Sequence, residues 1–295
     1  MKKRIFTGAG VAIITPMHQD GTVNYEKLAW LIEKQISEKT DAILICGTTG
    51  ESPTLSDQEH VKAIECAVQT ANGRVPVIAG TGSNNTAHGV DLSKEAQQLG
   101  ADGLLVVTPY YNKASQMGLV RHYTKIADSV SIPVIVYDVP SRTGVQIQPE
   151  TFLELSKHEN IVAVKAASGD ISQIASIRAL CGDQLDVYSG NDDQILPVLS
   201  LGGIGVLSVL SNILPRQTHD ICQYYFDGKI KESTALQLEL LDLIHALFID
   251  VNPIAVKEAM NFMGLEVGNC RLPLCELTDQ KREVLKQVLK KHKLI

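Results

Sequence analysis

The chain has 295 residues, of which 44% are hydrophobic and 20% charged, and this composition is typical of a globular protein with one large domain or two ordinary ones. The net charge of −6 argues against a nucleic-acid partner, and no apolar run approaches the roughly 18 residues that span a bilayer, so we expect no membrane partner either. Glycines and a proline interrupt residues 5–17, which argues against a signal peptide, and six cysteines without a C-x-x-C pair favour a reduced, cytoplasmic protein.

Eight short apolar runs follow one another along the first two-thirds of the chain. They lie at 10–14, 42–46, 75–79, 103–107, 134–137, 161–164, 185–188 and 204–209. Helix signals separate them, such as the capping box from Ser56 to Glu59. Eight strand-helix repeats predict a closed parallel (β/α)8 TIM barrel of the α/β class. A doubly wound sheet is the alternative, but no dinucleotide-type glycine fingerprint follows the first run.

The strand signal stops after residue 212, and four helical segments follow at 215–227, 230–248, 253–263 and 279–292. We therefore divide the chain into a catalytic barrel, 1–225, and an additional C-terminal helical region, 226–295. The second of the four segments carries an apolar stripe formed by Leu236, Leu240, Leu243 and Leu247. This stripe must be buried either against the barrel or against a second subunit.

Lys165 is the most informative residue, because it ends the apolar run 161–164. A free lysine amine has a pKa near 10.4, so only about one in 2,500 is neutral at pH 7. Burial lowers that pKa by roughly 3 to 5 units, and a neutral lysine can attack a carbonyl to form a Schiff base. For a lone lysine, however, a rim position with the ammonium in solvent is the commoner outcome.

Polar residues follow several of the predicted strands, at the barrel end where chemistry occurs in this architecture. Thr48 and Thr49 follow strand two between two glycines and offer hydroxyls and N–H groups to a small anion. Tyr137 ends strand five and can relay a proton, and Arg142 can grip a carboxylate with two hydrogen bonds. Each of these features has a simple structural explanation by itself: a strand-to-helix turn for the threonines, a core residue for Tyr137 and a surface ion pair for Arg142. Because all of them are expected at the same end of the barrel, we favour a functional site.

Phosphate and metal sites are not favoured by the sequence. Asp192 and Asp193 after strand seven would repel phosphate, and no glycine-rich cradle follows strand eight. The eight histidines are scattered without an H-x-x-x-H or H-E-x-x-H motif. Glu51, Asp138, Asp192 and Asp193 do not form a recognisable metal-ligand pattern. We expect no metal.

Four motifs together resemble the class I pyruvate-dependent aldolase/lyase family, over essentially the whole chain from Gly8 onward. They are Gly47-Thr48-Thr49-Gly50-Glu51, Thr108-Pro109-Tyr110-Tyr111-Asn112, Tyr137-Asp138-Val139-Pro140-Ser141-Arg142-Thr143-Gly144 and Val164-Lys165. The resemblance is strongest to members that condense pyruvate with L-aspartate 4-semialdehyde, which gives 4-hydroxy-tetrahydrodipicolinate at the first committed step of diaminopimelate and lysine biosynthesis. It implies a barrel, no cofactor beyond a covalent Schiff base with pyruvate, and a homotetramer arranged as a dimer of dimers.

The same resemblance implies roles for individual residues. Lys165 would form the Schiff base, and Tyr137, Thr48 and a Tyr111 from a neighbouring subunit would form the proton relay. Thr48 and Thr49 would bind the pyruvate carboxylate, and Arg142 the carboxylate of the semialdehyde. Gly190 and Leu207 would line the pyruvate pocket, and an allosteric lysine site would include Ser52, His60, Asn84 and Tyr110.

Four positions depart from the family pattern. Ala166 replaces a glutamate after the catalytic lysine, and Asp138 replaces an asparagine after the catalytic tyrosine. In the lysine site, Asp57 replaces a histidine and His88 replaces a glutamate. A cationic ligand loses a carboxylate partner at His88, so we predict weak or no inhibition by lysine.

Two alternative functions remain at this level. Within the same family, the chain could be an N-acetylneuraminate lyase or a 2-keto-3-deoxy sugar-acid aldolase, although these rarely carry an arginine matching Arg142. Outside enzymes, it could be a non-catalytic barrel that binds a keto acid, for which Ala166 gives slight support.

Overall fold

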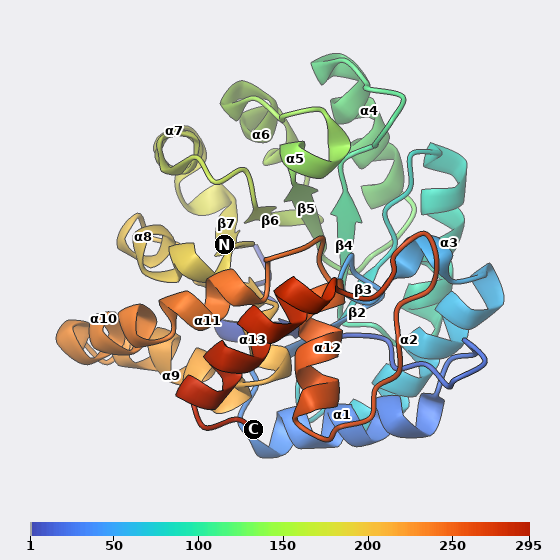
Figure 1. The fold of residues 1–295 in the computed structure, drawn as a ribbon. Helices are drawn as coiled ribbons and strands as arrows, with labels where there is room; N and C mark the ends of the chain where they lie inside the picture. The colour runs from blue at the N-terminus through green and yellow to red at the C-terminus, as the bar shows by residue number, and fades with distance from the viewer. Residues whose placement is uncertain (1) are drawn as a thin grey trace.

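Eight parallel strands close into a barrel in the computed structural model, which describes residues 2–295 (Figure 1). The strands are β1 Gly8–Ala12, β2 Ala42–Ile45, β3 Val77–Gly80, β4 Gly103–Val107, β5 Val134–Asp138, β6 Ile161–Ala166, β7 Asp186–Ser189 and β8 Gly205–Ser208. They are hydrogen-bonded in chain order, and β8 closes on β1. The predicted TIM barrel is confirmed, and each predicted strand lies within two residues of an observed one.

Helices surround the barrel and also extend beyond it. The surrounding helices are α1 Tyr25–Ser37, α2 Asp57–Ala71, α3 Thr86–Gln98, α4 Gln116–Ala127, α5 Pro140–Thr143, α6 Pro149–Leu155, α7 Ile171–Cys181, α8 Ile195–Ser200 and α9 Pro215–Phe226. The predicted capping box begins α2, where the Ser56 side chain and Glu59 cap each other. Short 3₁₀ turns η1 Ser52–Thr54, η2 Gly182–Gln184, η3 Asp192–Gln194 and η4 Leu210–Asn212 occupy connections.

Two layers of apolar side chains explain why the strand residues are buried on both faces. The inner layer fills the barrel and includes Leu44, Ile135, Tyr137 and Leu207. The outer layer joins the sheet to the helices. Side chains that alternate along one strand therefore face two apolar environments, which is why the strands read as continuous apolar runs. No helix among residues 2–295 is long and apolar enough to cross a membrane.

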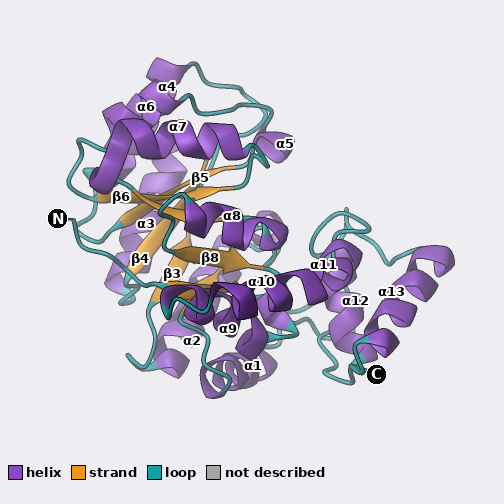
Figure 2. Ribbon diagram, turned by 90° about the vertical axis from the view of Figure 1, so that its left-hand side faces the viewer, coloured by secondary structure: helices purple, strands orange, loops and turns teal. Residues whose placement is uncertain are grey.

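The C-terminal helices form a lobe that projects from one end of the barrel (Figure 2). They are α11 Leu241–Ala246, α12 Ile254–Phe262 and α13 Asp279–Lys291, and the preceding helix α10 Ile230–Glu239 packs against α8 and α9 on the side of the barrel. The single helix predicted over 230–248 is wrong, because the chain breaks it at Leu240 into α10 and α11. Leu240, Leu243 and Leu247 are buried within the chain itself, so this stripe does not require a second subunit.

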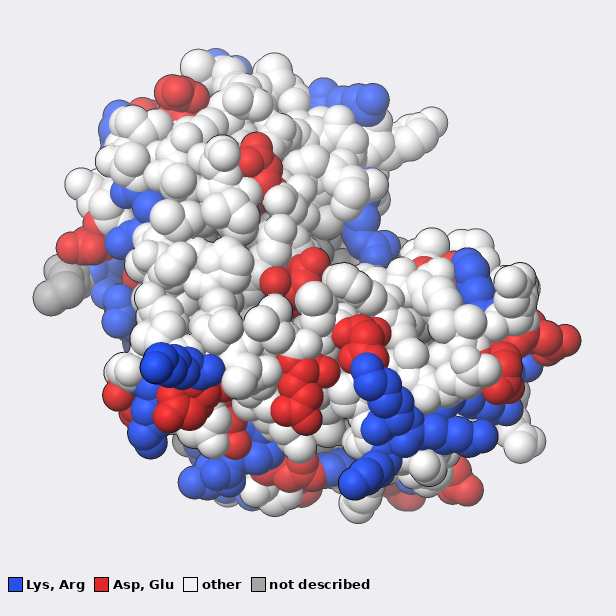
Figure 3. Space-filling model, turned by 60° about the vertical axis from the view of Figure 1, so that its left-hand side comes forward, with Lys and Arg blue, Asp and Glu red and all other residues white. Residues whose placement is uncertain are grey.

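The molecule is hollowed between this lobe and the barrel. The space-filling view shows the hollow with Lys or Arg atoms at its inner end, and acidic and basic side chains are interspersed over the rest of this face (Figure 3). The lobe reaches the strand ends directly, because the Asn252 side chain contacts Thr49 in the loop after β2.

Candidate active site

Strands β5 and β6 place Tyr137 and Lys165 side by side. The two residues are register partners, and the Lys165 Nζ lies 4.5 Å from the centre of the Tyr137 ring. Both side chains are buried, and the Lys165 residue is only 6% exposed. Lys165 is therefore not a rim lysine with its ammonium in solvent. The strand alternation points it into the barrel, whereas its neighbour Ala166 belongs to the outer apolar layer.

Burial lowers the pKa of Lys165 to about 8. This pKa already includes the negative charge of Asp192, which raises it, and the positive charge of Arg142, which lowers it. At a pKa of about 8, roughly one lysine in ten is neutral at pH 7, compared with about one in 2,500 for a free side chain. The site thus supplies a nucleophilic amine under ordinary conditions.

This pKa predicts how adduct formation with a keto acid depends on pH. Only the neutral amine attacks, so we expect the second-order rate constant to rise about tenfold per unit below pH 8 and to level off above it. Rapid-quench trapping of the adduct with borohydride between pH 6 and 9.5 measures this rate. A rate that still rises tenfold per unit at pH 9.5 would show that Lys165 has an unperturbed pKa.

The threonine loop, residues 46–51, brings two hydroxyls to the same place. The Thr48 hydroxyl lies close enough to the phenol of Tyr137 to lower the pKa of that phenol. The Thr49 Oγ1 accepts a hydrogen bond of 3.0 Å from the Asn252 Nδ2. Because that acceptor position is occupied by the amide, the single hydroxyl hydrogen of Thr49 remains free to be donated to a ligand. A carboxylate is a suitable acceptor for such donors.

Burial raises the pKa of Tyr137, and the charge of Arg142 and the nearby Thr48 hydroxyl oppose that rise. The phenol is thus protonated at neutral pH. It lies between a hydroxyl and an amine, which is the position that a proton-relay group requires.

Arg142 lies on α5, in the turn after β5, and its side chain lines a cavity of about 350 Å³ together with Thr48. Its Nη2 donates to the Asn252 backbone oxygen at 3.3 Å. In the part of the chain that the structure describes, no ion pair within 4.0 Å involves this guanidinium. The simple explanation of a surface ion pair therefore does not apply, and the guanidinium is available to a carboxylate from outside.

Gly190 and Leu207 are close to the same centre. The Gly190 N–H donates to the Ala166 oxygen at 2.7 Å, and a Cβ at Gly190 would lie 3.2 Å from the Lys165 Cε. Any side chain at residue 190 would therefore crowd the reactive lysine. Leu207 is fully buried in the inner apolar layer that also contains Tyr137.

Two residues of this site were not assigned to it from the sequence. Asp192 is buried, and its Oδ2 accepts hydrogen bonds from the Val209 and Leu210 N–H groups at 3.0 and 2.9 Å. Its position after strand seven was a usable signal, because its charge acts on Lys165 across the barrel. Asn252 comes from the C-terminal region, and nothing in the sequence pattern indicated that it would reach Thr49.

Tyr111 is not buried with Lys165 and Tyr137. Its side chain is 90% exposed, and its backbone is in the left-handed region at φ 72°. The adjoining residues are held in place, since Asn112 Nδ2 donates to the Asn84 oxygen at 2.9 Å and Asn84 Nδ2 donates to the Tyr110 oxygen at 3.2 Å. A strained, anchored loop that presents a bare phenol to solvent is typical of a residue that acts on another molecule.

The candidate allosteric residues lie around a cavity of about 350 Å³ that also reaches Thr48 and Arg142. Ser52, His60 and Tyr110 line it, and Asn84 is bonded to Tyr110. His60 is held by the Gly80 oxygen at 2.7 Å, and burial lowers its pKa.

Two of the departures from the family pattern meet in this cavity. The His88 Nε2 lies 3.1 Å from the Asp57 Oδ1, and both side chains line the cavity. Asp57 stands where the family pattern has a histidine, and His88 stands where it has a glutamate. The two positions therefore still hold one acidic and one basic residue, but in exchanged places.

Asp138, which replaces an asparagine of the family pattern, holds the segment that follows Arg142 in place. Its carboxylate accepts hydrogen bonds from the Ile147 N–H and from the Gln173 Nε2, both at 3.2 Å. Burial raises the pKa of Asp138 to about 6, although these hydrogen bonds oppose the rise. It does not contact the reactive groups. Among residues 2–295, no group of three or more His, Cys, Asp or Glu side chains is arranged to hold a metal ion.

Comparisons with known proteins found similar proteins over nearly the full length of the chain. The model of the dihydrodipicolinate synthetase family matches residues 5–292. The 4-hydroxy-tetrahydrodipicolinate synthase of Caldicellulosiruptor saccharolyticus is 59% identical over 97% of this chain and 96% of its own, and that of Acetivibrio thermocellus is 55% identical over the full length of both. The crystal structure of dihydrodipicolinate synthase from Aquifex aeolicus superposes with a TM-score of 0.96 at 45% identity, covering 98% of this chain and 99% of that one.

Proposed function

The chain belongs to the dihydrodipicolinate synthetase family, and from that premise we propose the role of each residue at the strand ends. It is a class I lyase that condenses pyruvate with L-aspartate 4-semialdehyde to 4-hydroxy-tetrahydrodipicolinate, the first committed step of diaminopimelate and lysine biosynthesis. The predicted function is confirmed at this level, and neither sugar-acid cleavage nor a non-catalytic role is favoured by the relatives.

In the proposed mechanism, neutral Lys165 adds to the pyruvate ketone and loses water to form a Schiff base. The cationic imine acidifies the pyruvate methyl group, which loses a proton to give an enamine that attacks the aldehyde. The amino group of the former semialdehyde then adds to the imine carbon and displaces the Lys165 amine, which closes the ring and frees the enzyme. Tyr137, near the Thr48 hydroxyl and lying against Lys165, supports proton transfer during these steps. The single observation that carries this proposal is the buried lysine with a lowered pKa beside a phenol. No cofactor takes part beyond the covalent bond to pyruvate.

The two substrates each carry a carboxylate, and we assign one clamp to each. Thr48 and Thr49 bind the pyruvate carboxylate near Lys165, with Gly190 and Leu207 lining the pocket. Arg142, which lines a cavity together with Thr48 and has no ion pair among residues 2–295, binds the carboxylate of the semialdehyde. The test is mass spectrometry after borohydride reduction with pyruvate. A stable adduct at Lys165 supports the proposal, whereas no adduct on folded protein would overturn it.

We place the enzyme in the cytoplasm as a homotetramer built from two dimers, with residues 1–225 as the catalytic barrel and 226–295 as a helical region. Tyr111 then completes the proton relay of a neighbouring subunit. The exposed phenol on a strained, anchored loop supports this arrangement.

Complementation between inactive chains tests the role of Tyr111. A Tyr111→Phe chain is expected to lose about 10²-fold in kcat. Co-assembled with a Lys165→Met chain, it should regain activity, because one of the two sites in each mixed pair would combine an intact Lys165 with the partner's intact Tyr111. Mixed assemblies no more active than the two parents would show that Tyr111 acts within its own chain or not at all, and an active monomeric variant would lead to the same conclusion.

A second prediction concerns regulation through the cavity lined by Ser52, His60 and Tyr110. The carboxylate that it offers, Asp57, is already paired with His88, so a lysine ammonium gains no free partner there. We expect 1 mM lysine to leave the initial rate unchanged within about 20%, as loss of a charge-assisted bond predicts.

The matched control restores the usual arrangement of this pair. The double variant Asp57→His with His88→Glu is expected to gain inhibition by lysine. Inhibition of the unmodified enzyme at sub-millimolar lysine would contradict the prediction.

A further inference from the structure

The threonine loop is held in a strained backbone conformation. Cys46 and Glu51, one on each side of the two threonines, both have φ 56°, in the left-handed region that favours glycine. Residues persist in this region only where the surroundings hold them there. The loop therefore requires external support to keep Thr48 and Thr49 in place.

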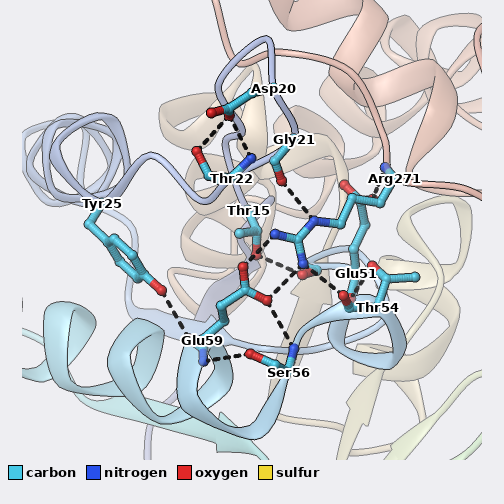
Figure 4. Close-up of polar contacts among 11 residues, drawn as sticks. Thr15, Asp20, Gly21, Thr22, Tyr25, Glu51, Thr54, Ser56, Glu59 and Arg271 are labelled. Carbon is cyan, nitrogen blue, oxygen red and sulfur yellow. Dashed lines mark hydrogen bonds and ion pairs between the residues drawn. The ribbon is translucent and has the colours of Figure 1, made fainter.

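A buried ion pair gives that support. The Glu51 carboxylate is 2.8 Å from the Lys257 Nζ, and both side chains are 1% exposed. The other Glu51 oxygen accepts a hydrogen bond of 2.8 Å from the Arg271 N–H. Figure 4 shows Glu51 directed toward Arg271, whose guanidinium bonds to Glu59 at the start of α2. A charge buried to this degree is stable only when it is fully paired, so the pair fixes the geometry of both partners.

Lys257 lies on α12, in the C-terminal helical region. Besides Glu51, its ammonium donates to the Thr15 oxygen at 3.1 Å and to the Asn269 oxygen at 2.7 Å, so each of its three protons has an acceptor. Thr15 is also tied to the loop, because its hydroxyl donates to the Gly50 oxygen at 2.6 Å. Lys257 thus joins the C-terminal lobe, the end of β1 and the threonine loop at one point.

The chain between the buried ion pair and the clamp residue Thr49 is very short. Glu51 is separated from Thr49 by a single residue, Gly50, which has no free space, since a Cβ there would lie 3.2 Å from the Ile13 oxygen. The same lobe also reaches Thr49 directly through Asn252. Movement of Glu51 would therefore displace the two hydroxyls that receive the carboxylate.

We propose that Lys257 is a positioning residue for pyruvate, which acts through Glu51 to hold Thr48 and Thr49 in their binding geometry. The C-terminal helical region is then a working part of the pyruvate site and not only a covering layer. This inference rests on the proposed function of the threonines as the pyruvate carboxylate clamp.

The test compares Lys257→Met with the wild type and with Arg282→Met. The control breaks a different ion pair of α12, in which Arg282 Nη2 lies 2.7 Å from Glu258 Oε1, and leaves Glu51 untouched. We expect Lys257→Met to raise the pyruvate concentration that half-saturates borohydride trapping at Lys165 by about 10- to 100-fold, while kcat/KM for the semialdehyde falls less than about threefold. The control should shift neither value by more than about twofold.

Two further variants keep the test decisive if Lys257→Met folds poorly. The pair Glu51→Gln with Lys257→Met removes both charges and should recover folding but not pyruvate affinity. Thr15→Val removes the hydroxyl that holds Gly50 without changing any charge, and should raise the pyruvate half-saturation about 3- to 10-fold.

The outcomes separate this inference from the proposed function. An unchanged pyruvate half-saturation in folded Lys257→Met, or in the pair Glu51→Gln with Lys257→Met, overturns the positioning role, and so does an equal loss in Arg282→Met. In each of those cases the wild-type adduct at Lys165 would still stand. No adduct in the wild type would instead contradict the proposed function.

Discussion

Replacement of Lys165 by methionine is expected to lower kcat at least about 10³-fold and to abolish the pyruvate adduct. The variant removes the nucleophile but keeps the threonine clamp and the phenol, so pyruvate should still bind without reacting. Steady-state rates and mass spectrometry after borohydride reduction measure both effects.

The same variant should be more stable than the wild type at neutral pH. The pKa of Lys165 is lowered from 10.5 to about 8, so the folded state binds this proton less tightly than the unfolded chain does. At 1.36 kcal/mol per unit, the folded state is destabilised by up to about 3 kcal/mol at any pH below 8, and the penalty disappears as the pH rises from about 8 to 10.5. Chemical denaturation at pH 7 should therefore show a gain in Lys165→Met that fades at pH 10.

Lys257 serves as the reference for the trapping experiment, because among residues 2–295 it is the other lysine with a buried side chain. It is paired with Glu51 and should remain unmodified. Substantial turnover by folded Lys165→Met, or an adduct that maps to Lys257, would contradict the assignment of the nucleophile.

Replacement of Arg142 by methionine is expected to lower kcat/KM for the semialdehyde by about 10²- to 10³-fold. Loss of a bidentate bond to a carboxylate costs on the order of 3 to 4 kcal/mol, and among residues 2–295 no carboxylate pairs with this guanidinium in the free protein. The pyruvate half-saturation of trapping should change far less, because the proposed mechanism assigns that carboxylate to Thr48 and Thr49. Steady-state kinetics with each substrate varied separate the two effects.

A lysine at the same position gives the matched comparison. Arg142→Lys keeps the charge but cannot form two parallel bonds, so it should recover only part of the activity. If the methionine variant impaired pyruvate and semialdehyde equally, Arg142 would be a general electrostatic group and not the clamp of the second substrate.

The sequence was sufficient to predict the barrel because each strand is buried on both faces. An inner and an outer apolar layer impose apolar residues at consecutive positions, and eight such runs leave few alternatives to a closed sheet. The sequence also predicted that Tyr137 and Lys165 lie close together, because consecutive parallel strands are neighbours in a barrel and end at the same side of it. The family membership and the reaction were likewise predicted from four motifs.

The contribution of the C-terminal region could not be predicted in this way. Local pattern places Asn252 and Lys257 on or near a helix, but their contacts with Thr49 and Glu51 join residues about 200 positions apart. The break at Leu240 was also missed, because the apolar stripe continues through it on one side and gives no signal of a change in direction. A helical stripe shows that a face is buried, but not which surface covers it.

The central claim is that this site joins a Schiff base of pyruvate to an aldehyde that carries its own carboxylate. The most direct test is the initial rate with pyruvate and L-aspartate 4-semialdehyde, beside pyruvate with N-acetylmannosamine and with glyceraldehyde. We expect rapid turnover of the semialdehyde alone, because only that substrate offers a carboxylate to Arg142. Preference for a sugar aldehyde would keep Lys165 as the nucleophile but would contradict the assigned reaction and the role of Arg142.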